Sequence, residues 1–458
     1  MSKYPKIAFI GAGSTVFMKN VIGDILQMEP LQGAHVALMD INEKRLEESA
    51  TVAMRMVDTL DVEAKFTSHT DQKEALDGAD FVIVAFQIGG YDPCTITDFE
   101  IPKEFGLRQT IADTLGIGGI MRGLRTVPHL WSICEDMLSE CPDATLIQYV
   151  NPMAINMMAI SRKYPQIKSV GLCHSVRWTA WGLSSDLGIP MEKVNYTSAG
   201  INHISFFLNF EEIMEDGSLR DLYPDLKRGY VEGRFPKDES QPNPGCIDKV
   251  RYEMMKRLGY FVTESSEHFA EYTPWFIKEG REDLIEKFTI PLDEYPRRCV
   301  NQMRDWDKAL DNLKGNAPMT FKRSFEYAPD IILAMWTGQP HVIYGNVPNN
   351  HLIENLPQDA IVELPILVDR NGLQPTRIGK LPSQLAAVMQ PSVTVQGLTV
   401  DALMDENPEA IYHAAMMDPH TSAELDLDQI WAMVDKLRKA HGEWLPEWAR
   451  AGTVTKVA

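Results

Sequence analysis

The stretch Lys6-Ile7-Ala8-Phe9-Ile10-Gly11-Ala12-Gly13-Ser14 predicts a short apolar strand that runs directly into a glycine turn. Apolar residues then recur at steps of three and four, which predicts a helix; they are Val16, Phe17, Val21, Ile22, Ile25 and Leu26. Glycines let the backbone approach a pyrophosphate, and a helix N-terminus offers free N–H groups and a positive dipole end. We therefore expect a dinucleotide site that uses Gly11, Gly13 and Ser14.

A second apolar strand, residues 35–39, ends at Asp40, whose carboxylate is placed to accept hydrogen bonds from an adenosine ribose. The pattern departs from the dinucleotide fingerprint at Val16, which stands where a third glycine is typical. Strand, helix and Asp40 are in register, so the prediction of nucleotide binding stands.

Strands and helices keep alternating as far as about residue 195. We expect buried strands at 79–86, 144–150 and 170–173, and helices at 41–60, 118–140 and 153–164. Such alternation predicts a parallel sheet whose site lies at the carboxyl ends of its strands. The residues at those ends are Gly11, Asp40, Phe86, Gln87, Asn151 and Cys173, and we assign Phe86, Gln87 and Asn151 to the cofactor.

The fold class predicted is α/β, with a Rossmann-like doubly wound parallel sheet followed by a mixed α+β domain, as in lactate and malate dehydrogenases. We place the nucleotide-binding domain at residues 1–195, and a domain for substrate, metal and oligomerisation at 196–458. Within the second, helices are expected at 247–258 and 293–313, and strands at 341–344 and 360–364. The proline-rich stretch 233–245 is interpreted as a surface loop or as a mobile lid.

Two further stretches contain residues suited to metal binding. Val170-Gly171-Leu172-Cys173-His174-Ser175-Val176 ends a strand in a thiol and an imidazole, and Gly200-Ile201-Asn202-His203 adds a second imidazole. Thiolate and imidazole suit a divalent transition metal, and two ligands leave positions open for substrate. The alternative is a buried cysteine that packs as a small hydrophobe. The position of Cys173 at a strand end favours the metal site.

Composition restricts the class of partner and the compartment. A net charge of −20 argues against nucleic acid and against an anionic membrane surface. The six cysteines are scattered without a C-x-x-C pair, which is typical of reduced thiols in a cytosolic enzyme. No apolar run approaches the roughly 18 residues of a membrane span. A charged helix follows the N-terminal apolar run instead of a cleavage region, so we expect a cytoplasmic protein and no signal peptide.

Several strings together resemble the NAD- and manganese-dependent glycoside hydrolases of family 4, over nearly the whole chain. These strings are residues 9–15 (FIGAGST), 85–91 (AFQIGGY), 110–116 (TIADTLG), 149–153 (YVNPM), 173–176 (CHSV), 200–203 (GINH) and 265–272 (SSEHFAEY). The resemblance implies that NAD+ takes a hydride from sugar C3, that a base then removes the acidified C2 proton, and that the aglycone leaves C1. Water adds and the hydride returns, so the net reaction is hydrolysis. In this scheme Mn2+ or another divalent metal stabilises the enediolate.

The resemblance also implies roles for individual residues. Cys173 and His203 would bind manganese, and Cys173 would make the enzyme sensitive to oxidation. His174 stands where the phosphosugar branch has Asp or Asn before a proline, which argues against a 6-phosphoglycoside, and the string CHSV is associated with α-galactosides such as melibiose. His174 is a candidate general acid for the leaving oxygen, or else an imidazole that orients a ligand or binds sugar.

The C2 base is left open among Glu264, Glu267 and Tyr272, with Glu264 and Tyr272 taken as the catalytic candidates. Asn151 and Asn202 are assigned to sugar and nicotinamide contacts. Asp113 is assigned to sugar binding; the alternative is a cap on a helix that begins near Gly118.

Three alternatives remain beside α-galactoside hydrolysis. An α-glucosidase or α-galacturonidase would share most of these motifs. An NAD-dependent 2-hydroxy acid dehydrogenase would share the fold but needs no metal thiolate, and a non-catalytic NAD sensor would need few polar residues at the strand ends. The family implies a homodimer or a homotetramer.

Overall fold

The chain is organised around one mixed β-sheet. The computed structural model describes residues 3–237, 248–315, 319, 321–450 and 452. Six parallel strands lie in the order β3-β2-β1-β4-β5-β6. They are β1 (Lys6–Ile10), β2 (His35–Met39), β3 (Lys65–His69), β4 (Phe81–Val84), β5 (Thr145–Gln148) and β6 (Lys168–Gly171). This is the doubly wound order, whose direction reverses between β1 and β4, where such sheets bind ligands.

The sheet continues beyond β6 into antiparallel strands from residues 194–375. These are β10 (His341–Pro348), β11 (Ile361–Asp369), β7 (Val194–Ile201), β8 (Ile204–Ile213), β9 (Leu219–Asp221) and β12 (Gly372–Pro375). Asn346 of β10 pairs with Gly171, and Glu363 of β11 pairs with Gly200. The end of β6 and the β7–β8 turn are therefore held two strands apart at one edge of the site.

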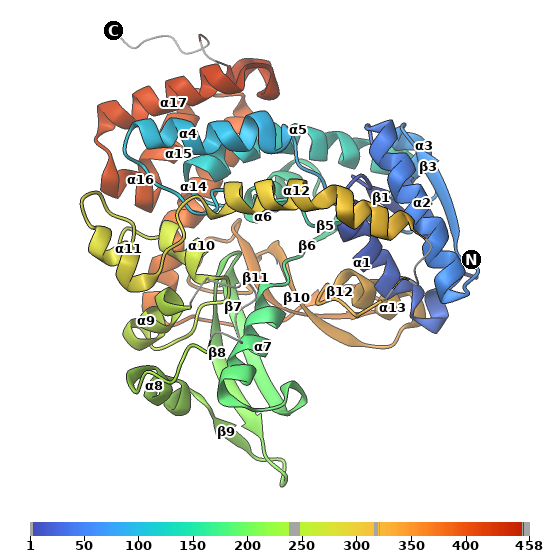
Figure 1. Ribbon diagram of the computed structural model, residues 1–458, viewed down its shortest axis with the longest axis horizontal. Helices are drawn as coiled ribbons and strands as arrows, with labels where there is room; N and C mark the ends of the chain where they lie inside the picture. The colour runs from blue at the N-terminus through green and yellow to red at the C-terminus, as the bar shows by residue number, and fades with distance from the viewer. Residues whose placement is uncertain (1–2, 238–247, 316–318, 320, 451, 453–458) are drawn as a thin grey trace.

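Helices cover both faces of the sheet (Figure 1). Those of the first half are α1 (Thr15–Leu26), α2 (Glu43–Leu60), α3 (Gln72–Leu76), α4 (Ile96–Glu104), α5 (Gly116–Glu140), α6 (Met153–Lys163) and α7 (Ser175–Leu187). The helices that follow residue 196 are α8 (Tyr223–Val231), α9 (Lys249–Leu258), α10 (Ser266–Glu271), α11 (Glu282–Phe288), α12 (Glu294–Lys314), α13 (Ala328–Thr337), α14 (Ser383–Asp405), α15 (Glu409–Met417), α16 (Pro419–Glu424) and α17 (Leu427–His441). The C-terminal helices α14 to α17 pack against α4, α5 and α6 (Figure 1).

The predicted fold class is confirmed, with differences in detail. The helix expected at 41–60 begins at Glu43, because the Asn42 side chain accepts a hydrogen bond from the Arg45 N–H and caps it. The hairpin of β7 and β8 was not predicted, because much of both strands is buried and its residues do not alternate between apolar and polar. Residues 238–247, which contain most of the stretch interpreted as a loop or a lid, lie outside the described residues.

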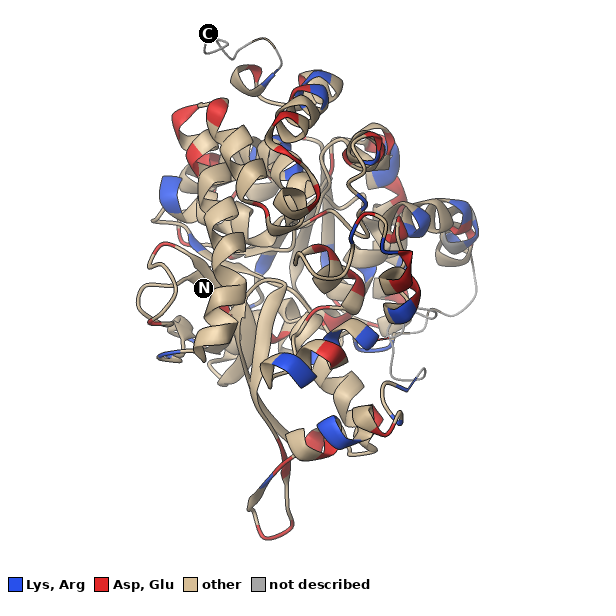
Figure 2. Ribbon diagram, turned by 90° about the vertical axis from the view of Figure 1, so that its left-hand side faces the viewer, with Lys and Arg blue, Asp and Glu red and all other residues tan. Residues whose placement is uncertain are grey.

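Lys and Arg positions (blue) and Asp and Glu positions (red) are interspersed along the ribbon in Figure 2. Among the described helices, none combines the length and the apolar character that a bilayer crossing requires.

Candidate functional site

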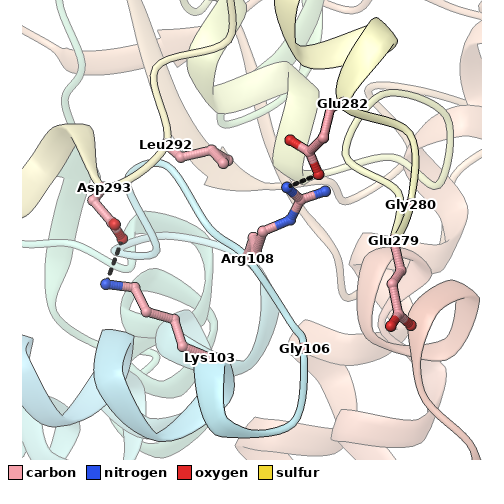
Figure 3. A pocket seen from close by; sticks show the side chains of 8 residues that line it. All are labelled: Lys103, Gly106, Arg108, Glu279, Gly280, Glu282, Leu292 and Asp293. Atoms are coloured by element: carbon pink, nitrogen blue, oxygen red, sulfur yellow. Dashed lines mark hydrogen bonds and ion pairs between the residues drawn. The ribbon is translucent and has the colours of Figure 1, made fainter.

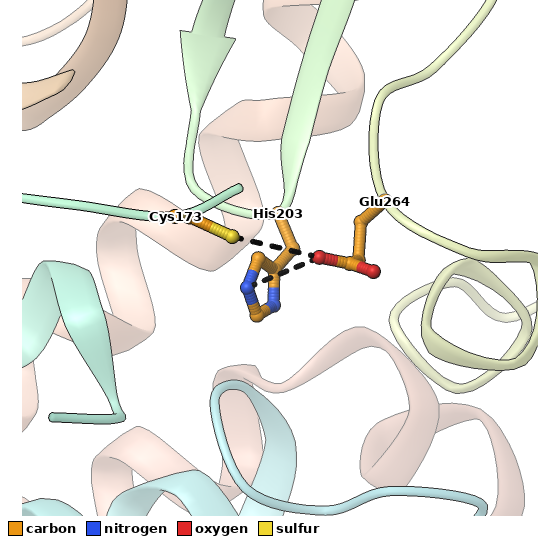
Figure 4. A group of neighbouring side chains, drawn as sticks. All are labelled: Cys173, His203 and Glu264. Atoms are coloured by element: carbon orange, nitrogen blue, oxygen red, sulfur yellow. Dashed lines mark hydrogen bonds and ion pairs between the residues drawn. The ribbon is translucent and has the colours of Figure 1, made fainter. Parts of the chain in front are cut away.

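Cys173, His203 and Glu264 meet at the carboxyl edge of the sheet (Figure 4). Cys173 follows β6, His203 forms the β7–β8 turn, and Glu264 precedes α10. His203 Nε2 lies 3.3 Å and Cys173 Sγ 3.7 Å from Glu264 Oε2, and one ligand atom from each residue lies within 4.8 Å of the others. These separations match neighbouring donors around one divalent ion, whose bonds to N, O and S are about 2.0–2.3 Å long.

The charges of these side chains suit a cation. Burial lowers the pKa of His203 to about 4, so its imidazole is neutral and free to donate a lone pair. Burial acts to raise the pKa of Glu264, but the nearby His203 and His268 outweigh it and bring the value to about 2. Burial, and then the charge of Glu264, raise the pKa of Cys173 well above its ordinary value. The thiol would lose its proton only when a metal binds. The donor set therefore fits a divalent transition metal.

The other side of the His203 ring is also occupied. Tyr272 OH lies 3.3 Å from His203 Nδ1, and the two rings are stacked with centroids 6.4 Å apart. A partner on the second ring nitrogen fixes the orientation and tautomer of a metal-binding imidazole. Burial and the charge of Glu271 raise the pKa of Tyr272 well above its ordinary value, so the phenol is neutral.

His174 lies next to this group but faces solvent. Its side chain is 56% exposed, and its Nδ1 lies 3.3 Å from Oε1 of Glu326, which precedes α13. The surrounding protein lowers the pKa of His174, but the hydrogen bond and charge of Glu326 outweigh it and raise the value to about 8. An exposed and largely protonated imidazole is suited to donate a proton.

Asp113 stands on a loop that Glu271 holds. The buried Glu271 carboxylate accepts hydrogen bonds from the N–H groups of Thr110 (2.7 Å), Ile111 (3.1 Å) and Ala112 (2.8 Å). Ala112 has φ of 52°, in the left-handed region that is costly for a residue with a side chain. Glu271 therefore stabilises a loop conformation that the sequence alone does not favour.

The Asp113 carboxylate lies close enough to His203 and His268 for their charges to act on it. Asn151 donates from Nδ2 to its Oδ2 at 3.0 Å. Burial acts to raise the pKa of Asp113, but Arg122 and the nearby histidines hold it below its ordinary value. Helix α5 begins at Gly116 with Leu115 at its N-cap and no side-chain cap, so the alternative of Asp113 as a helix cap is wrong.

Asn202 is fully buried beside His203, and its Nδ2 donates to Glu363 Oε1 at 3.2 Å. Glu363 also accepts from Ser205 Oγ (2.8 Å) and Asn346 Nδ2 (3.2 Å). These bonds fix the turn that carries His203. The sugar contact predicted for Asn202 stays a prediction.

The predicted nucleotide turn has the required close packing. A Cβ on Gly11 would lie 2.2 Å from the Ala85 carbonyl oxygen, and one on Gly13 would lie 2.6 Å from Asp40 Oδ2. Ser14 is the N-cap of α1 and makes no side-chain cap bond, so this helix end offers N–H groups to an anion. A Cβ on Gly11 would also meet Phe86, 3.0 Å away. These features fit a dinucleotide.

Two of the predicted cofactor residues already have partners. Asp40 Oδ2 accepts from the Gly13 N–H at 2.8 Å, so this carboxylate faces the turn. The Gln87 amide donates to Gly90 O (3.0 Å) and accepts from Tyr295 OH (3.1 Å). Contacts of Asp40 and Gln87 with a cofactor stay predictions.

A hollow lies on the surface beside Gly106 and Arg108 (Figure 3). Two ion pairs cross it, Lys103 to Asp293 at 2.9 Å and Arg108 to Glu282 at 2.7 Å. The cations are thus already neutralised, and this hollow contains none of the predicted site residues.

Three glutamates of the site were not predicted from the sequence. Glu363 is a charged residue within an apolar strand, and that pattern could have indicated a buried functional carboxylate. Glu271 lies in residues 265–272, where no local pattern assigns it a specific role. Glu326 has no local signal because it meets His174 only through the fold.

Comparisons with known proteins agree over most of the chain. A model described as family 4 glycosyl hydrolase matches residues 6–189, and one for the C-terminal domain of the same family matches 198–421. An α-galactosidase of Bacillus subtilis (strain 168) is 48% identical over 97% of this chain and 99% of its own. An α-galactosidase of Rhizobium meliloti (strain 1021) is 32% identical over 97% and 90%.

A solved structure has the same fold. It is a 6-phospho-α-glucosidase from gut microorganisms in complex with NAD and Mn2+, with a TM-score of 0.81, 20% identity, and coverage of 97% of this chain and 100% of that one.

Proposed function

The chain belongs to family 4 of the glycosyl hydrolases, and from that premise we propose that it hydrolyses α-galactosides of the melibiose type. The observation that carries the proposal is the group Cys173, His203 and Glu264, which lies at the same sheet edge as the glycine turn. A hydrolase that acts by simple acid–base chemistry needs neither feature.

We propose NAD+ and Mn2+, or another divalent metal, as cofactors. Gly11, Gly13, Ser14 and Phe86 would hold the dinucleotide, and Cys173 and His203 the metal. When bound, NAD+ supplies reversible hydride exchange at sugar C3, and the metal supplies a Lewis acid for the adjacent oxygens.

Glu264 is our proposed acceptor of the C2 proton. It is ionised throughout the neutral range, whereas the buried Tyr272 phenol is not. Tyr272 instead holds His203 through Nδ1. Glu267, the third candidate, is paired with Arg298 at 2.5 Å.

On the side of the leaving group, His174 would donate a proton to the glycosidic oxygen. Asp113 and Asn151 would bind sugar hydroxyls, because the carboxylate is buried, ionised, bonded to Asn151 and near the site histidines.

We propose residues 1–195 as the nucleotide-binding domain and residues 196–458 as the domain for substrate, metal and subunit contacts. Cys173, His174 and Asp113 of the first domain complete the substrate and metal site. We further propose a cytoplasmic homodimer or homotetramer that has no nucleic-acid or membrane partner. The net charge of −20 supports the last point.

The test is hydrolysis of p-nitrophenyl α-galactoside by protein stripped with EDTA and charcoal, with Mn2+, NAD+ and a thiol reductant added back singly and together. Release of nitrophenol only with all three, and without net NADH, is expected. Turnover of the α-glucoside or α-galacturonide in place of the galactoside would change the substrate and keep the mechanism. NADH formed from a 2-hydroxy acid, with no glycoside cleaved, would overturn the proposal in favour of a dehydrogenase.

A further inference from the structure

Three aromatic side chains cluster at the start of α7. Trp178 and Trp181 are stacked with ring centroids 5.4 Å apart, and Phe325 meets Trp178 edge-on at 4.5 Å. All three are partly exposed. Large rings that stay accessible to solvent after folding are a usual component of a binding surface.

The cluster adjoins His174 from two sides. His174, Trp178 and Trp181 are spaced by four and three residues, so they follow one face of the helix. A hydrogen bond of 3.0 Å from the Trp178 N–H to the His174 carbonyl closes the first turn between them. From the other side, Phe325 directly precedes Glu326, the partner of the His174 ring. The aromatic cluster is therefore adjacent to His174 both along α7 and along the segment that contains Glu326.

This position determines which part of a substrate would meet the rings. Cys173, which belongs to the metal site, directly precedes His174. Trp178 and Trp181 follow His174 by about one and two helical turns. A galactose ring held against the metal donors would therefore place its leaving group past His174, over the cluster. A pyranose leaving group has a face of C–H bonds that packs well on an aromatic ring, and its hydroxyls stay hydrated at the edge.

We propose that Trp178, Trp181 and Phe325 form the binding site for a sugar leaving group, which makes the enzyme selective for disaccharides over simple alkyl galactosides. This inference rests on the function proposed above. Trp178 is the central ring, since its centroid lies 5.4 Å from that of Trp181 and 4.5 Å from that of Phe325, whereas those two are 6.4 Å apart.

The experiment compares melibiose, whose leaving group is a sugar, with methyl α-galactoside, whose leaving group is too small to reach the rings. In Trp178→Ala, the ratio of kcat/KM for melibiose to that for methyl α-galactoside should fall on the order of tenfold, as for loss of a central tryptophan contact. Trp178→Phe keeps a ring and should recover part of the ratio. Glucose should inhibit the wild type competitively, and this inhibition should weaken in Trp178→Ala.

The matched control is Trp431→Ala, which removes a partly exposed tryptophan of α17 that stacks on Tyr412 at 4.3 Å. This variant should keep the wild-type ratio. An unchanged ratio in Trp178→Ala, whether or not both activities fall, would overturn the inference. If both activities fall equally and light scattering shows a changed mass, the rings belong to a subunit contact instead. Wild-type protein that cleaves no α-galactoside would refute the proposed function instead.

Discussion

His203 Nε2 lies 3.3 Å from Glu264 Oε2, so an imidazole that is neutral and a carboxylate that is ionised face each other across a buried edge of the sheet. Because the two groups lie side by side at one edge of the site, one can hold a metal while the other takes a proton from a substrate bound next to them. The remaining Glu264 oxygen accepts from the Ser265 N–H at 2.9 Å, which fixes the carboxylate in place.

We expect Glu264→Gln to separate these roles. The amide keeps an oxygen toward the metal, so Mn2+ binding should stay within about tenfold of wild type. Without a base, exchange of the C2 hydrogen with solvent deuterium should fall by about 10²–10⁴. Electron paramagnetic resonance measures the first and mass spectrometry of recovered sugar the second. Exchange that survives at saturating Mn2+, with metal binding strongly weakened, would make Glu264 a ligand only. Tyr272→Phe tests the other candidate base. Exchange of the C2 hydrogen with solvent deuterium should persist in this variant, because Glu264 is still present.

Cys173→Ser should abolish tight Mn2+ retention, because a hydroxyl does not ionise near neutral pH as a metal-bound thiol does. Metal content after dialysis is the measurement. The control is Cys299→Ser, since Cys299 is also a free, partly exposed thiol but lies on α12. Peroxide should inactivate wild type and Cys299→Ser at similar rates. Equal metal content in all three proteins would remove Cys173 from the site.

His174→Gln should reveal the general acid through the leaving group. Nitrophenolate leaves without help, whereas methoxide needs a proton. We therefore expect activity on methyl α-galactoside to fall by about 10²–10⁴, and activity on p-nitrophenyl α-galactoside to fall much less. Falls of the same size on both substrates would assign the imidazole to sugar binding.

The parallel part of the sheet could be predicted because both faces of its strands are buried, which makes the strands short runs of apolar residues. Residues 81–84, for example, form such a run between two turns, and this pattern is typical of a buried strand. Cys173 was recognisable as a site residue because strand ends converge. Its meeting with His203 depends on β10 and β11, which come from more than a hundred residues further along the chain and insert between β6 and β7.

The sequence alone does not reduce the candidates for the C2 base to one, because the direction of each acidic side chain depends on where α10 begins. Glu264 precedes the first turn and faces the metal donors, whereas Glu267 faces Arg298 and Glu271 faces the Asp113 loop. A shift of one residue in the start of the helix would turn Glu267 and Glu271 by about 100° around the helix axis. Local sequence does not fix that start, since Ser265 makes no side-chain cap.

Glu271→Gln should weaken the Asp113 loop. An amide offers one acceptor oxygen in place of two, and its NH2 group would face a backbone N–H. We expect KM for the galactoside to rise by about tenfold or more, with a smaller change in kcat, since the loop positions substrate and not the reacting proton. A change confined to kcat would contradict this role. Calorimetry with NAD+ is the control, because the glycine turn lies elsewhere and cofactor affinity should be unchanged.

The same variant tests how Glu271 links pH to stability. Burial, partly offset by the three N–H bonds, raises the pKa of Glu271 from 4.5 to about 6. A carboxyl with a raised folded pKa adds stability that is complete below the unfolded pKa and is lost as pH rises through about 6. A shift of 1.5 pKa units corresponds to about 2 kcal/mol. Urea unfolding of wild type and Glu271→Gln from pH 4.5 to 7 should therefore show wild type losing about 2 kcal/mol relative to the variant across that range. A difference that stays constant, or that grows in favour of wild type as pH rises, would mean that the N–H bonds outweigh burial and that Glu271 is ionised throughout.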